Sequence, residues 1–201
     1  CLPDFAWDGG EPFYDGPTAL ANSLWWFDSK AETLVTGGWP ESPPTVADNY
    51  PLLTAYGPWD DHTITNTKPF IADLAAQLDT TAEGTSREAL TAGIDAYLVA
   101  HDAASDFYTH TQTSPTFAWV ADEVETCEDV ILLLGFYESM ADGTWERKGG
   151  HWVNAAGVNR AGGMIGISDP YTDSANVQSF FDVMYTGRVF PPEHLGTPFT
   201  A

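Results

Sequence analysis

The stretch that decides the fold is YDGPTALANSLWW, residues 14–26, which combines a sharp turn with an apolar stripe. Asp15 is a candidate N-cap, because its carboxylate can accept a hydrogen bond from an unpaired amide in a first helical turn. Pro17 suits that turn, since the amide that it lacks would have no partner there. Apolar residues then recur at helical spacing, which predicts a helix from residue 15 to about residue 30 with one buried face.

A second patterned block lies in the last third of the chain. Residues 151–158, HWVNAAGV, and 164–168, MIGIS, flank the glycine-rich turn RAGG and predict two antiparallel strands. Residues 129–137 are almost continuously apolar, which predicts a central strand covered on both faces. The turn at Asp142-Gly143 would return that strand to the next one. Residues 176–190 are expected to add a strand pair, and residues 191–201 resemble a tail or a linker.

The segment between these blocks reads mainly as helices. Apolar residues at helical spacing predict one helix over 69–78, and Thr85 with Glu88 resembles a capping box that opens another. A further helix is expected after Ser114-Pro115, whereas residues 107–111 alternate like a strand. The predicted order is therefore helices first and sheet second, which is an α+β layout.

Both blocks resemble one known family. Residues 16–22, GPTALAN, are similar to the start of the catalytic helix in the bacteriocin-processing (double-glycine leader) cysteine peptidases. Residues 149–158, GGHWVNAAGV, and 165–170, IGISDP, resemble the strand that carries the catalytic His of this family and the hairpin partner that ends in Asp-Pro. His151 and Asp169 match those positions. The resemblance implies one papain-like domain over residues 1–201, with a helical half packed on an antiparallel β-sheet half and a cleft between them.

The sequence departs from this family at its nucleophile. The family has Cys directly before Gly-Pro, and this chain has Asp15. A carboxylate is a poor nucleophile toward an amide, whereas the family chemistry needs a thiolate, a His and a group that orients the His. The family's oxyanion Gln also has no counterpart, since Gly9 lies near its place. The resemblance thus implies a catalytically impaired domain, a pseudoenzyme, that binds a peptide or protein partner or takes part in assembly.

Two alternatives for Asp15, His151 and Asp169 stay open. The first is an active peptidase or hydrolase, either by covalent catalysis or with Asp15 and His151 activating water. The second is a metal site, because two carboxylates and an imidazole can hold a catalytic metal ion.

A separate candidate cation site lies at Asp60, Asp61 and His62. Carboxylate oxygens there could bind a divalent cation such as Ca²⁺, although the spacing matches no regular calcium loop. A solvated loop in which an Asp caps a turn is the simpler interpretation. The chain otherwise predicts no cofactor.

The charge balance limits the partners. The 201 residues include 7 basic and 29 acidic side chains, a net charge of −22, so nucleic acid and anionic membrane surfaces would be repelled. No apolar run approaches the roughly 20 residues that a membrane helix needs. Cys1 and Cys127 could form a disulfide, or Cys127 could be a small buried apolar residue. The acidity, the first residue and the possible disulfide favour an extracellular or cell-envelope location, as a domain of a larger cell-surface protein.

Overall fold

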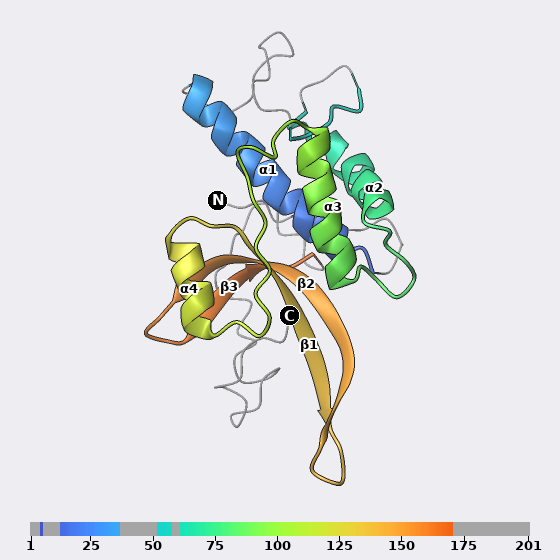
Figure 1. Cartoon of the computed structure of the whole chain (residues 1–201), viewed down its shortest axis with the longest axis vertical. Helices are drawn as coiled ribbons and strands as arrows, with labels where there is room; N and C mark the ends of the chain where they lie inside the picture. Colours follow the sequence, from blue (N-terminus) through green and yellow to red (C-terminus); the bar gives the residue numbers. More distant parts are fainter. Residues whose placement is uncertain (1–4, 6–12, 37–51, 58–60, 171–201) are drawn as a thin grey trace.

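The computed structural model describes residues 5, 13–36, 52–57 and 61–170, and within 30–36 it describes the backbone only. The elements in chain order are α1 (Asp15–Thr36), the 3₁₀ turn η1 (Ile64–Asn66), α2 (Thr67–Gln77), α3 (Arg87–Ala100), α4 (Phe117–Glu125), β1 (Val130–Ser139), β2 (Trp145–Asn159) and β3 (Met164–Ser168). The predicted α+β class is confirmed (Figure 1). No helix in the described part of the chain is long and apolar enough to cross a membrane.

The three strands form one antiparallel sheet in the order β1-β2-β3. Leu134 of β1 lies opposite His151 of β2, and Asn154 of β2 lies opposite Ser168 of β3. The far end of the β1–β2 hairpin projects away from the helices (Figure 1), and its residues are mostly exposed. The register of the sheet therefore places the end of β3 beside the middle of β2.

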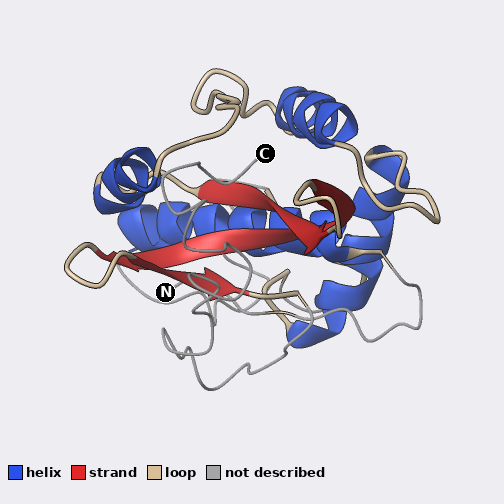
Figure 2. Ribbon diagram, turned by 90° about the horizontal axis from the view of Figure 1, so that it is seen from below, coloured by secondary structure: helices blue, strands red, loops and turns tan. Residues whose placement is uncertain are grey.

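The core lies on both faces of the sheet. On one face, α1, α2 and α3 enclose a cluster that includes Leu20, Phe70 and Trp152. On the other face, Val120 of α4 packs with alternate residues of β1 and β2, among them Leu134. Figure 2 shows the strands crossing the middle of the molecule with helices around them. The sheet is therefore anchored directly against α1, the helix that begins with Asp15.

The position predicted for the apolar strand is wrong in one respect. Residues 129–137 were expected to form a central strand, but among the described strands β1 lies at an edge and β2 is central. Both faces of β1 are nevertheless covered, because Leu133 packs toward the first cluster and Leu132 belongs to the second. A continuous apolar run indicates that the side chains on both faces of a strand are buried. It does not indicate whether the strand has a neighbouring strand on each side.

Two helix starts differ from the sequence prediction by one or two residues. The cap of α3 is Ser86, whose hydroxyl accepts a hydrogen bond from the Ala89 amide at 3.1 Å. Thr85 instead pairs its hydroxyl with that of Thr80. Helix α4 is capped by Thr116, and α1 continues to Thr36 rather than ending near residue 30.

Two further expectations are wrong. Residues 107–111 form no strand but a loop, in which the Thr109 hydroxyl donates to Asp95 of α3 at 2.5 Å. Cys127 is exposed rather than buried and has a φ of 67°, because it lies in the turn that ends α4. The expectations for Cys1, residues 176–190 and residues 191–201 lie outside the described residues.

Candidate functional site

The three residues singled out by the sequence lie together. Asp15 is the first residue of α1, His151 lies on β2, and Asp169 directly follows β3. His151 Nδ1 is 3.1 Å from Asp15 Oδ2, and His151 Nε2 is 2.7 Å from Asp169 Oδ1. One carboxylate therefore pairs with each ring nitrogen, so the imidazole bridges the helix and the end of the sheet.

Asp15 connects α1 to β2 through its carboxylate. Besides contacting His151, its Oδ2 accepts a hydrogen bond from the Trp152 backbone amide at 2.8 Å. The position at the start of a helix favours a negative charge, because the free amides there carry partial positive charge. The sequence predicted that this carboxylate caps the helix; in the structure Asp15 is the first residue of α1, and its carboxylate binds the neighbouring strand β2.

Gly16 allows the start of α1 to approach its neighbours closely. A methyl group at this position would lie 2.8 Å from Thr85 Cβ and Oγ1 and 3.2 Å from Trp152 Cδ1. The Trp152 indole is itself fixed, since its N–H donates to the Thr85 carbonyl at 2.9 Å. A larger residue at Gly16 would displace Asp15 from the imidazole.

The electrostatics of the site make His151 a cation. Its side chain is 4% exposed, and those of Asp15 and Asp169 are 11% exposed. Burial taken alone would lower the pKa of His151, but hydrogen bonds to both carboxylates and their negative charges outweigh burial and raise the pKa to about 9. At neutral pH the ring is therefore an imidazolium that donates from both nitrogens.

This arrangement limits the chemistry that the three residues can perform. A general base needs a ring nitrogen with a free lone pair, and an imidazolium has none. A metal ion shared with both carboxylates is also disfavoured, because they lie at different ring nitrogens and at hydrogen-bonding distance. The geometry instead suits a stable charge-assisted link.

The sequence did not predict a polar network next to this site. Ser23 of α1 donates to Asp129 Oδ2 at 2.5 Å, and Asn154 of β2 donates to Ser23 Oγ at 2.7 Å and to the Ala19 carbonyl at 3.0 Å. Burial raises the pKa of Asp129 to about 6, although the Ser23 hydrogen bond opposes the rise. Polar residues within strongly apolar segments were the signal that could have revealed this network.

A cavity of about 680 Å³ opens beside Asp15. Its walls come from the segment before α3, the start of α3 and the strands β1 and β2. Three acidic and three basic side chains line it: Asp15, Glu83, Glu88, Arg87, Arg147 and Lys148. Since the whole chain has only 7 basic residues against 29 acidic ones, the cavity departs locally from the acidity of the rest.

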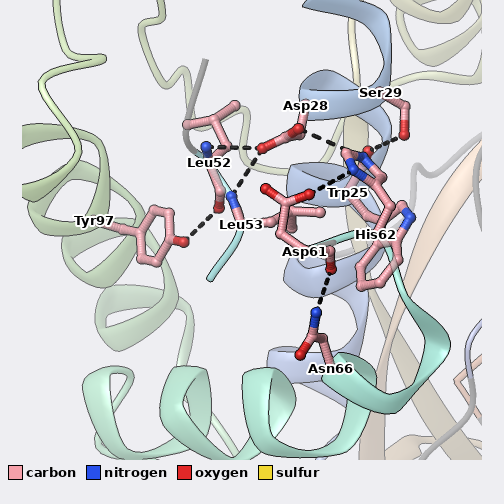
Figure 3. Close-up of polar contacts among 9 residues, drawn as sticks. All are labelled: Trp25, Asp28, Ser29, Leu52, Leu53, Asp61, His62, Asn66 and Tyr97. Carbon is pink, nitrogen blue, oxygen red and sulfur yellow. Dashed lines mark hydrogen bonds and ion pairs between the residues drawn. The ribbon is translucent and has the colours of Figure 1, made fainter. Parts of the chain in front are cut away.

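The second predicted site is only partly described. Asp60 lies outside the described residues, whereas Asp61 and His62 are adjacent and in contact, with 2.9 Å between Asp61 Oδ1 and His62 Nδ1. The structure adds Asp28 of α1, whose Oδ1 lies 3.4 Å from His62 Nε2 (Figure 3). Asp28 could not be predicted as part of this site, because it lies far from His62 in the sequence.

Comparison of the chain with protein-family models, with curated proteins and with solved structures gave no match. The function is therefore inferred from the geometry of the site and from the sequence motifs.

Proposed function

We propose that this chain is a papain-like cysteine-peptidase scaffold whose nucleophile has been replaced by Asp15, and that it serves as an extracellular or cell-envelope binding or assembly module. The observation that carries the proposal is the pairing of Asp15 with His151 at 3.1 Å, with Asp169 at the other ring nitrogen. The family resemblance implies that a Cys, a His and a third orienting residue occupy these places. Here the first place holds a carboxylate.

The state of His151 supports a loss of catalysis. A thiol peptidase uses its imidazole both to accept and to return a proton. With a pKa of about 9 and a carboxylate at each nitrogen, His151 retains its proton at neutral pH. The replaced nucleophile and the occupied imidazole point to the same conclusion, that the site stabilises the domain rather than cleaving a bond.

The cavity beside Asp15 supports a binding role. It is large enough for a few residues of an extended peptide, and two of its lining residues, Gly149 and Gly150, have no side chain of their own. The Arg147 guanidinium lines it and contacts the Gly149 carbonyl through Nε at 3.2 Å. Acidic and basic groups in equal number suit a peptide, which presents both carbonyls and amides along its backbone.

The first experiment separates binding from hydrolysis. A proteome-derived peptide library is incubated with the purified chain, and both the cleaved and the retained peptides are identified by mass spectrometry. We expect no cleavage and a defined set of retained peptides. Retention should weaken in Arg147→Gln but not in Arg160→Gln, whose guanidinium pairs with Glu125 outside the cavity.

Two outcomes would contradict the proposal. Cleavage that disappears in both Asp15→Ala and His151→Ala would show that the domain is an active hydrolase. If no peptide is retained and the chain sediments as a monomer, both the binding role and the assembly role are lost.

A further inference from the structure

The cluster formed by Asp28, Asp61 and His62 has a geometry that differs from the His151 site in one decisive respect. Both His151 contacts, at 3.1 and 2.7 Å, fall within the range of hydrogen bonds. At His62 only the Nδ1 contact does so, at 2.9 Å, whereas Nε2 lies 3.4 Å from Asp28 Oδ1. An N–H···O hydrogen bond spans about 2.7–3.2 Å, so the Nε2–Oδ1 contact has the distance of an ion pair rather than that of a hydrogen bond.

Asp28 is fixed so that one oxygen faces His62. The residue is fully buried in α1. Its Oδ2 accepts hydrogen bonds from the Leu52 amide at 2.8 Å and from the Leu53 amide at 2.9 Å. Oδ1 is thereby directed toward the imidazole, as Figure 3 shows. The carboxylate cannot turn away without breaking both backbone contacts.

His62 is fixed as firmly as Asp28. Its ring lies edge-on to Trp25, with 5.4 Å between the ring centroids. The Asp61 carboxylate accepts a hydrogen bond from His62 Nδ1. The backbone carbonyl of Asp61 in turn accepts a hydrogen bond from the Asn66 side chain at 2.8 Å. When Nδ1–H of a His donates to a carboxylate, the lone pair of the ring lies on Nε2, on the other side of the imidazole. This is the usual arrangement of metal-binding histidines.

The separation between Nε2 and Oδ1 equals the spacing of two ligands on one metal ion. Zinc binds imidazole nitrogen and carboxylate oxygen at about 2.0–2.2 Å, and two such ligands at the tetrahedral angle are about 3.4 Å apart. Asp28, Asp61 and His62 each offer one donor atom within 4.8 Å of the others. Their side chains are only 0%, 12% and 7% exposed, so the donor set is preorganised and largely shielded from water.

We propose that Asp28, His62 and Asp61 form a binding site for one divalent transition-metal ion, with Zn²⁺ the ion that the spacing fits best. His62 Nε2 and Asp28 Oδ1 are the direct ligands, Asp61 orients the imidazole from Nδ1, and water molecules would complete the coordination. An imidazole in the donor set favours Zn²⁺ over Ca²⁺, which prefers six to eight oxygens. The ion would fasten α1 to the segment that carries His62, apart from Asp15, His151 and Asp169.

The test measures metal binding by the full chain after chelator treatment. Zn²⁺ is titrated by calorimetry, and Co²⁺ serves as a spectroscopic probe, because its visible absorption bands report a low-coordinate site. We expect one tight equivalent per chain. His62→Gln and Asp28→Asn should each lose at least about tenfold in affinity, and Asp61→Asn about 10- to 100-fold. Zn²⁺ should also raise the melting temperature of the wild-type chain.

The other Asp–His–Asp site supplies the matched control. His151→Gln and Asp169→Asn should bind Zn²⁺ as the wild type does. The proposal is overturned if the wild type shows no tight equivalent, if Ca²⁺ binds in preference to Zn²⁺, or if binding is lost in His151→Gln and kept in His62→Gln. Should Asp28→Asn fail to fold by circular dichroism, the surface-nearer Asp61→Asn decides the same question.

Discussion

The charge state of His151 predicts a specific dependence of stability on pH. The imidazolium lies between Asp15 and Asp169, and its pKa is raised from 6.5 to about 9. A group whose pKa is higher in the folded state binds its proton more tightly there, so it stabilises the fold. This contribution is fully present below pH 6.5 and is lost as the pH rises through 9. His151→Gln removes the titrating group and should remove this dependence.

The magnitude follows from the two pKa values. Each pKa unit corresponds to about 1.4 kcal/mol, so the contribution below pH 6.5 is about 3 kcal/mol. Between pH 7 and pH 9 the folded protein keeps most of its proton while the unfolded chain has lost it. The free energy of unfolding should therefore fall by about 2 kcal/mol over this interval.

The assay is urea denaturation of the wild type and of His151→Gln at pH 7, 8 and 9, followed by tryptophan fluorescence. The decisive quantity is the difference in unfolding free energy between the two proteins at each pH, because other titrating groups cancel in it. Asp129, with a pKa of about 6, titrates below this interval. Asp15 and Asp169 are present in both proteins.

We expect the destabilisation caused by His151→Gln to shrink by about 2 kcal/mol from pH 7 to pH 9. A difference that stays constant over this range would show that His151 is neutral in the folded protein. In that case the imidazole would be free to act as a base, and the argument against catalysis would fail.

Three further predictions concern the surroundings of the site and are tested by urea denaturation. Gly16→Ala should destabilise the fold by about 1–3 kcal/mol, because its methyl group would lie 2.8 Å from Thr85. Gly149→Ala is the control and should change stability little, because the nearest contact of its methyl group would be at 3.8 Å. Equal losses of stability in the two variants would refute the packing argument. The free energy of unfolding of Asp129→Asn should rise by about 2–3 kcal/mol relative to that of the wild type between pH 4 and pH 8. The reason is that the wild type loses stability from about pH 3.8, where the carboxyl ionises in the unfolded chain, up to about pH 6, where it ionises in the folded protein as well. Parallel pH profiles would contradict this. Ser86→Ala should cost about 1 kcal/mol through the lost cap of α3, and no loss would mean that another group caps this helix.

Much of the secondary structure follows from local patterns, and the errors have physical causes. The start of α1 and the β2–β3 hairpin were predicted correctly, because caps, apolar periodicity and glycine turns act over a few residues. Residues 107–111 alternate like a strand, but their threonines bond to α3 instead. Cys127 is exposed because the end of α4 requires a left-handed residue there, which its small apolar side chain does not reveal.

The candidate sites show what local patterns leave out. Asp15, His151 and Asp169 could be named together because two motifs resemble, in the right order, those of one family. The charge on His151 could not be predicted, since it depends on burial and on which nitrogen meets which carboxylate. Asp28 and Asp129 were missed for a related reason. Each contacts residues that are distant in the sequence. Asp28 contacts His62, and Asp129 accepts a hydrogen bond from Ser23, which accepts one from Asn154.

The most direct test of the central proposal returns sulfur to residue 15. Asp15→Cys is made in a chain that also carries Cys1→Ser and Cys127→Ser, and the rate of alkylation by iodoacetamide is measured from pH 4 to pH 9. If the scaffold is that of a thiol peptidase, the helix start and His151 should hold the new thiol as a thiolate, so alkylation should already be fast below pH 7. A rate that rises only around pH 8.5, as for an ordinary thiol, and that does not change in His151→Gln would contradict the proposal.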